Sequence, residues 1–175
     1  MSVYDDLLAQ ASTPQRSDPL GSMELLLALS QRSGTTPGRG GTGTIDGSGL
    51  SSDLTSQLPG WWTPETTTWH GVTLNSRAMA SFQRASQILG SPIMVTDSFR
   101  TWDQQANAYQ NKPGIAAPPG HSFHQTGLAI DVNGNAYGGY GSSQYQRLVK
   151  VLSRLGWTRF DPAGEPWHFS YKVRG

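Results

Sequence analysis

Residues 58–175 carry apolar positions at spacings typical of short helices that alternate with strands. A helix is predicted over residues 76–89, because Asn75 or Ser76 can cap its start and Gly90 can end it. The positions of this helix expected to face the core are Phe82, Ala85, Ile88 and Leu89. The pattern therefore begins with a helix that covers an apolar core.

Two more helices and four strands follow from the same pattern. Thr101 can cap a helix over residues 102–110, and Ser142 or Ser143 can cap another that ends at Gly156. The inward positions of that last helix are Leu148, Val151, Leu152 and Leu155. Segments rich in β-forming residues predict strands over 92–99, 127–132, 157–160 and 167–172. This mixture predicts one α+β domain.

The first third of the chain has a different pattern. Short helices are predicted over residues 2–11 and 19–29, in an arm that ends near residue 34. Helices this short are marginal alone in water, so we expect the arm to dock on another surface of this chain or of a partner. Residues 35–57 are rich in Gly, Ser and Thr and predict a flexible linker. The glycines do not indicate a phosphate-binding loop, because no Gly-Lys-Ser/Thr follows them.

Composition narrows the chemistry. The 175 residues include no cysteine, which excludes disulfides, thiolate metal sites and a cysteine nucleophile. Charged residues make up 14% of the chain and the net charge is +1, with no basic run, so we expect no nucleic-acid partner. The longest apolar run, residues 25–29, is too short to span a membrane. Asp5 and Asp6 stand where a secretory leader is basic, so no export signal is expected.

Three ionisable residues near element ends predict a metal site. His124 and Asp131 are seven residues apart, an odd spacing that would put them on opposite faces of an unbroken strand. Gly127 can break that strand, so that His124 approaches from a loop. His168, in a later strand, would complete the three-ligand open site of a catalytic zinc, although this donor set also suits other divalent metals. Glu165 lies three residues before His168 and could act as a general base.

Each of these residues also has an ordinary structural interpretation. An aspartate before the turn at residues 133–135 is often a turn former, and a lone histidine is often a surface or core residue. We interpret His70 in that way. The combination of His124, Asp131, His168 and Glu165 in a charge-poor domain keeps the metal site as a hypothesis.

Three segments, in order, resemble one family of peptidases. Residues 122–131, SFHQTGLAID, are similar to the S-x-H-x-x-G-x-A-x-D signature of the zinc D-alanyl-D-alanine carboxypeptidases and L-alanyl-D-glutamate endopeptidases. Residues 165–168, EPWH, resemble the second motif of this family, E-x-W-H. Residues 98–101, SFRT, resemble its upstream element, and Gln105 stands where a glutamine recurs. The resemblance implies a fold shared with the Hedgehog signalling domain, in which helices flank a small antiparallel sheet.

The resemblance also implies roles for individual residues. His124, Asp131 and His168 would bind one zinc ion and leave a fourth position for water. Glu165 would take a proton from that water and pass it to the leaving amine. Arg100 would stabilise the oxyanion or hold a carboxylate of the substrate.

Five further residues are expected in or near the cleft. Ser122 and Gln105 are predicted to contact the substrate or to support the residues that do. His121 stands where the family has a small or polar residue, and it is predicted at the rim of the cleft or as a substrate contact, with an exposed surface residue as the alternative. Trp102 and Tyr109 either line the cleft or pack in the core.

The resulting hypothesis is a zinc peptidase that cuts a peptidoglycan stem peptide, either at D-Ala-D-Ala or at L-Ala-D-Glu. The arm and the missing export signal suggest a component of a phage particle, docked by the arm to tail or baseplate proteins and acting on the bacterial cell wall. A free endolysin, made in the host cytoplasm before release, is the nearest alternative. A zinc-stabilised binding module without catalysis is a third, and Glu165 together with Arg100 argues against it.

Overall fold

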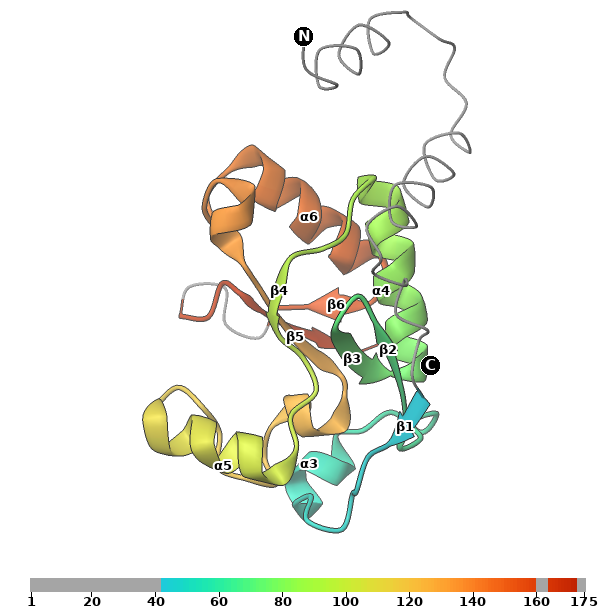
Figure 1. Cartoon of the computed structure of the whole chain (residues 1–175), viewed down its shortest axis with the longest axis vertical. Coiled ribbons are helices and arrows are strands. Elements are labelled where there is room, and N and C mark those ends of the chain that lie inside the picture. The colour runs from blue at the N-terminus through green and yellow to red at the C-terminus, as the bar shows by residue number, and fades with distance from the viewer. Residues whose placement is uncertain (1–41, 160–163, 173–175) are drawn as a thin grey trace, which may run out of the picture. The chain divides into compact units, whose positions relative to one another are not determined.

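The computed structural model describes residues 42–159 and 164–172, and the compact unit to which they belong begins at Gly38. Its elements form two antiparallel sheets and a set of short helices (Figure 1). The arm predicted over residues 1–34 lies outside the described residues. No helix within the described ranges is long and apolar enough to cross a membrane.

The first sheet has three strands in the order β1-β2-β3. Its strands are β1 (Thr42–Thr44), β2 (Glu65–Trp69) and β3 (Val72–Asn75). The β2–β3 hairpin turns at His70 and Gly71, which have φ values of 49° and 77°. The second sheet has four strands in the order β4-β5-β7-β6. They are β4 (Val95–Asp97), β5 (Ala129–Val132), β7 (His168–Tyr171) and β6 (Trp157–Thr158).

Side-chain caps fix the starts of the main helices. Asn75 caps α4 (Ser76–Leu89), and Ser142 caps α6 (Ser143–Arg154). Thr101 begins α5 (Trp102–Asn111) with a reciprocal capping box that involves Gln104. The remaining helices are short: α3 (Ser52–Ser56) and the 3₁₀ helices η2 (Phe123–Thr126) and η3 (Gly134–Tyr137).

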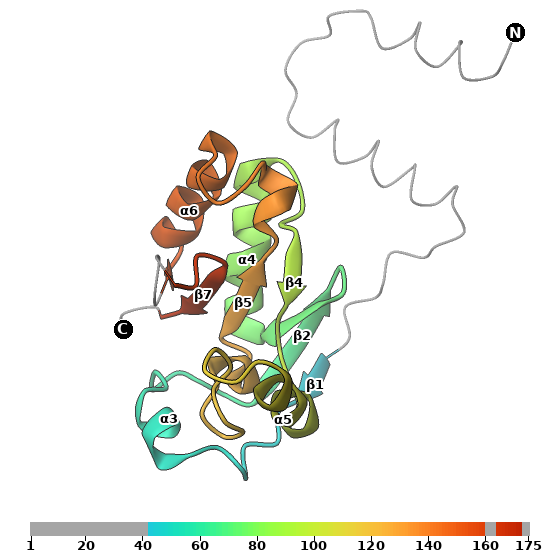
Figure 2. The same ribbon diagram turned by 90° about the vertical axis from the view of Figure 1, so that its left-hand side faces the viewer.

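One apolar core joins α4 and α6 to the two sheets. Helix α4 contacts α6, β2 and β3, and α6 contacts β6. Helix α5 lies at the opposite end of the domain from α6 (Figure 2). Buried residues from several elements fill the core, among them Leu74, Phe82, Ile130, Leu148, Leu152, Trp157 and Phe169. This core supports β5 and β7 at the centre of the second sheet.

The predicted α+β fold with small antiparallel sheets and flanking helices is confirmed. The predicted helices agree with α4, α5 and α6, whereas the strands are shorter than predicted. The expectation that Ile88 faces the core is wrong, because 44% of this side chain is exposed at the outer edge of α4. Strands β1, β2 and β3 were not predicted.

The prediction of a flexible linker over residues 35–57 is wrong for its described part, residues 42–57. Strand β1 pairs with β2, and Ile45 and Leu54 are almost fully buried. The Ser51 amide donates a hydrogen bond to the Gly120 carbonyl at 2.9 Å. Although the segment has few apolar residues, two of them, Ile45 and Leu54, are part of the core. The domain therefore begins before residue 58.

Two truncations test this boundary. A chain that starts at residue 38 is expected to keep the melting temperature of the full chain, whereas a chain that starts at residue 58 loses Ile45 and Leu54 from the core. Removing a buried aliphatic side chain costs about 2–5 kcal/mol. Thermal unfolding followed by circular dichroism should therefore show a large fall in melting temperature for the shorter chain alone. Equal melting temperatures for the two truncations would show that residues 38–57 are dispensable.

Candidate metal centre

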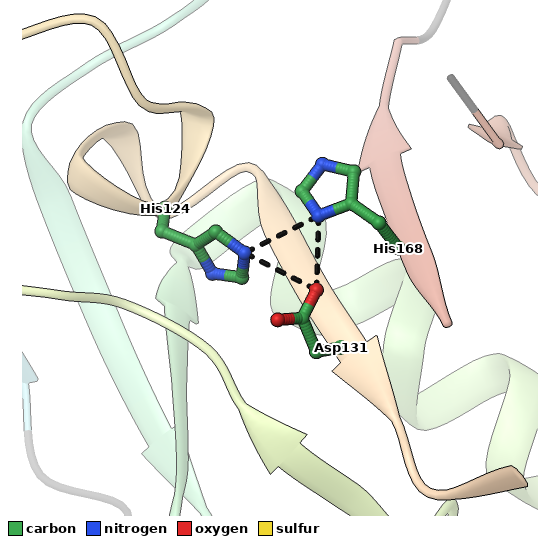
Figure 3. Close-up of side chains that lie close together, drawn as sticks. All are labelled: His124, Asp131 and His168. Carbon is green, nitrogen blue, oxygen red and sulfur yellow. Dashed lines mark hydrogen bonds and ion pairs between the residues drawn. The ribbon is translucent and has the colours of Figure 1, made fainter. Parts of the chain in front are cut away.

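Three segments bring His124, Asp131 and His168 together (Figure 3). His124 lies in η2, which ends at Gly127 in the left-handed conformation with φ 69°. Asp131 lies in β5 and pairs directly with His168 of β7 across the antiparallel ladder. The strand break at Gly127 is as predicted, and it lets the histidine before the strand face the carboxylate within it.

The three candidate ligand atoms form a small triangle. Asp131 Oδ1 lies 2.9 Å from His168 Nδ1 and 3.3 Å from His124 Nε2, and the two nitrogens are 3.3 Å apart. Ligands about 2.0–2.1 Å from a tetrahedral zinc ion are separated by roughly 3.3 Å. The donor set and its spacing therefore fit three ligands of a tetrahedral metal ion, and all three residues line the cleft.

Outer hydrogen bonds orient both histidine rings. His124 Nδ1 lies 2.6 Å from the Ser98 carbonyl, to which it donates, so its Nε2 is left as a metal donor. His168 Nε2 lies 3.2 Å from Ser170 Oγ, which leaves Nδ1 facing the triangle. The Ser98 carbonyl can only accept, so it fixes the tautomer of His124, while the Ser170 hydroxyl orients the ring of His168. The arrangement is typical of a metal site.

Asp131 is held as a carboxylate. Burial by itself raises the pKa of this group, but hydrogen bonds and charge from His124 and His168 together bring the pKa well below its ordinary value. Its second oxygen, Oδ2, lies 3.5 Å from Arg100 Nη2. One oxygen is thus available to a metal while the other contacts a guanidinium.

Arg100 is part of the wall of the centre. Its Nε and Nη2 lie 2.8 and 2.7 Å from Asp97 Oδ2, and its Nη1 donates to Gln105 Oε1 at 3.0 Å. Gln105 is fully buried, and its amide also donates to the Ala117 carbonyl at 2.6 Å. The structure therefore places Gln105 behind Arg100, which agrees with the second of its two predicted roles, support of a residue that contacts the substrate.

A cleft of about 590 Å³ opens beside the triad. Its lining includes Arg100 and the three triad residues, together with Glu165, Ser122 and His121. Ser122 also caps η2 by accepting a hydrogen bond from the His124 amide at 3.3 Å. The structure thus brings to one cleft every predicted site residue except Gln105, which lies behind it.

Tyr145 was not predicted as a site residue, yet it supports the turn that carries Glu165. It lies in α6, is fully buried, and its hydroxyl donates a hydrogen bond to the Pro166 carbonyl. Burial raises the pKa of Tyr145 to about 12, so the hydroxyl stays a donor. In the sequence, Tyr145 is distinguished only by its position on the inward face of α6. That position is equally typical of an ordinary core residue.

Trp102 and Tyr109 neither line this cleft nor pack in the core, so both predicted alternatives are wrong for them. Trp102 is 49% exposed and lines a separate pocket beside Gly49, and Tyr109 is 44% exposed on α5. His70 lies in the β2–β3 turn against Trp69. The interpretation of His70 as a surface residue agrees with this position.

Substitution of Gly127 is expected to weaken metal binding. An alanine there would adopt an unfavourable positive φ, and its Cβ would lie 2.5 Å from the Asn75 backbone nitrogen. The backbone around η2 must then shift and move His124. We expect G127A to lower zinc affinity at least tenfold in a competition titration with a chromogenic chelator, since loss of an outer support already costs about 10–100-fold.

Gly90→Ala is the matched control. Gly90 has φ 76°, but a Cβ added there would meet no atom within 4 Å, so the substitution carries the conformational cost without the clash. G90A should lower the melting temperature slightly and leave zinc affinity unchanged. Equal zinc affinities for G127A and G90A would show that the strand break does not position His124.

Residues 73–174, more than half of the chain, match the family described as VanY, D-alanyl-D-alanine carboxypeptidase. The matched range contains the whole triad, the turn with Glu165 and the wall formed by Arg100. The fold carries a histidine–aspartate–histidine cluster whose spacing fits a metal ion. The chain belongs to the VanY D-alanyl-D-alanine carboxypeptidase family.

Individual relatives are more distant. A D-alanyl-D-alanine carboxypeptidase of Enterococcus faecalis is 36% identical over 64 residues, which cover 31% of this chain and 24% of that protein. The vancomycin-resistance D,D-dipeptidase VanXYg, solved with a D-Ala-D-Ala phosphinate analogue, has a TM-score of 0.50 at 22% identity, covering 59% of this chain and 52% of that one.

A vancomycin-resistance D,D-pentapeptidase VanY variant, solved with Zn(II), has a TM-score of 0.48 at 24% identity, over 66% of this chain and 83% of that one. The chain spans about a quarter of the curated relative and about half of VanXYg. The likeness to VanXYg is one of fold.

Proposed function

We propose that this protein is a zinc-dependent peptidase that hydrolyses the D-Ala-D-Ala bond at the end of peptidoglycan stem peptides. The observation that carries the proposal is the triangle of His124, Asp131 and His168, with Glu165 in the wall of the same cleft. Membership of the VanY family supports the substrate class. Three protein donors leave the open position that catalysis requires.

His124, Asp131 and His168 would hold the zinc ion, which would supply a Lewis acid for the scissile carbonyl and lower the pKa of the attacking water. Glu165 takes a proton from the attacking water and delivers it to the leaving amine. Its carboxylate is not one of the ligand atoms of the triad, so it is available for this proton transfer. No protein nucleophile is required.

Arg100 stabilises negative charge that develops on the substrate. Its contacts to Asp97 and Asp131 occupy both hydrogens of Nη2, and the bond to Gln105 uses one hydrogen of Nη1. Within the described part of the chain, a second Nη1 hydrogen remains for an oxygen of the substrate. Because its neighbours hold the guanidinium in place, little reorganisation accompanies charge development.

The bond that is cut distinguishes a D-Ala-D-Ala carboxypeptidase from an L-Ala-D-Glu endopeptidase. Digestion of a purified pentapeptide stem and of whole peptidoglycan, followed by mass spectrometry, should show loss of one terminal alanine and no other product. Release of a fragment that begins with D-Glu would instead show the L-Ala-D-Glu endopeptidase. No product with any divalent metal would leave the alternative of a binding module without catalysis, which the presence of Glu165 and Arg100 in the cleft disfavours.

Where the protein acts is the subject of a second proposal, separate from the reaction. We propose that residues 1–34 dock the protein in a phage particle from which the peptidase reaches the cell wall, with a free endolysin as the alternative. Those residues lie outside the described ranges. Probing purified particles with an antibody to the peptidase domain distinguishes the two, because only the docked protein remains with the particles.

A further inference from the structure

One face of the β7 segment points a row of polar side chains into the cleft. His168, Ser170 and Lys172 all line it, whereas Phe169 and Tyr171 between them are buried in the core. This is the alternation expected of a strand, in which residues two apart share a face. The row places a metal ligand, a hydroxyl and an ammonium group along one wall.

The ammonium of Lys172 lies near the segment that supplies one metal ligand. Its Nζ lies 4.9 Å from the centre of the Phe123 ring, and Phe123 directly precedes His124. Its backbone amide donates to the Gly156 carbonyl at 2.8 Å. An aromatic face attracts a cation without neutralising its charge. The backbone of Lys172 is thus anchored beside β6, while its exposed side chain lies against Phe123, next to His124.

Lys172 has a positive charge without a counter-ion in the described part of the chain. None of the ion pairs among residues 42–159 and 164–172 includes it. Among the described residues, the carboxylates that line the cleft are Asp131, which the triad and Arg100 occupy, and Glu165, the proposed general base. A lysine in a cleft wall under these conditions is available to an anionic group of a ligand.

The separation of Lys172 from the metal ligand His168 indicates which carboxylate of the substrate Lys172 could bind. A strand rises about 3.3 Å per residue, so the backbone of Lys172 lies roughly 13 Å along the strand from that of His168. An extended peptide covers about 3.3–3.6 Å per residue. The terminal carboxylate of a D-Ala-D-Ala peptide is one residue, about 3.3–3.6 Å, beyond the scissile carbonyl, whereas an internal carboxylate two or three residues before that bond is about 7–11 Å away. The internal carboxylate is therefore closer to the separation of the two backbones.

We propose that Lys172 is a specificity-determining residue that binds an internal carboxylate of the stem peptide, the free carboxylate of its D-glutamate. This inference rests on the proposed function and adds to it a preference for acidic stem peptides over those in which this carboxylate is amidated. Lys172 contacts the substrate away from the reacting atoms, so it contributes to KM and not to kcat.

The test compares two pentapeptide stems, one with the D-glutamate carboxylate free and one with it amidated, on the zinc-loaded full chain. For K172Q, we expect KM for the acidic peptide to rise about threefold to fivefold, the effect of an exposed ion pair, with kcat unchanged. KM for the amidated peptide should be unchanged. K150Q is the matched control, because Lys150 is exposed on α6 and outside the cleft, and it should behave as the wild type with both peptides.

Three outcomes would overturn the inference: no change in KM for K172Q, an equal change for the two peptides, or a change that disappears only when the terminal carboxylate is amidated. If the wild type hydrolyses neither peptide, the proposed function fails separately. Binding of the same peptides by calorimetry then still tests Lys172. A preference of the wild type for the acidic peptide that K172Q lacks would support the inference, and equal preferences would contradict it.

Discussion

Glu165→Gln is expected to lower kcat for D-alanine release by about 10²–10⁴-fold, the usual contribution of a positioned general base. Glutamine has the same shape as glutamate but cannot accept the proton of the attacking water. Glu165 lies in the cleft wall, outside the three ligand positions. Zinc content, measured by mass spectrometry of the metal, should therefore remain that of the wild type.

Glu65→Gln is the matched control for this substitution. Glu65 is an exposed glutamate of β2, in the sheet that does not carry the triad, and E65Q should retain full activity. If E165Q kept more than a tenth of the wild-type kcat, Glu165 would not be the general base. If it lost its zinc, the residue would act in metal binding instead.

Asp131→Asn is expected to produce the second large effect, a fall in zinc affinity of more than about 100-fold. The substitution removes the negative charge between the two histidines and leaves Arg100 without one of its two carboxylate contacts. Loss of an outer support alone costs about 10–100-fold, and loss of a ligand costs more. Zinc should then no longer raise the melting temperature, because a ligand stabilises only the state that binds it.

Asp103→Asn serves as the control, since Asp103 is an exposed aspartate in the first turn of α5 and lies outside the triad. Its zinc affinity and its zinc-dependent rise in melting temperature should match those of the wild type. A D131N protein that still bound one zinc tightly would show that the metal site lies elsewhere in the chain.

The resemblance to the peptidase motifs predicted the triad, because those motifs are local. The spacing of His124 and Asp131 left a metal site as a hypothesis in which Gly127 could break the strand, and the structure has that break. The direct pairing of Asp131 with His168 depends on strand register. Register is set by packing across the sheet, which short motifs do not encode.

Positions that depend on packing were harder to predict. The sequence left two roles open for Gln105, and only tertiary packing, which buries it behind Arg100, distinguishes support from substrate contact. Strand β1 lies in a Gly- and Thr-rich segment whose composition favours a flexible linker, and its pairing with β2 is a long-range interaction. The β2–β3 hairpin does have a sequence signal, because two short β-forming runs flank residues 70–71. In the structure both residues of this turn have positive φ values.

The most direct test of the catalytic metal centre is a zinc titration of the metal-free protein, with D-alanine release from a pentapeptide stem as the measured quantity. Three ligands around one open position predict activity that rises with added zinc and stops rising at one equivalent per chain. The activity should disappear when a chelator removes the metal. Full activity of the metal-free protein, or no release of D-alanine at any ratio of zinc to protein, would contradict the account.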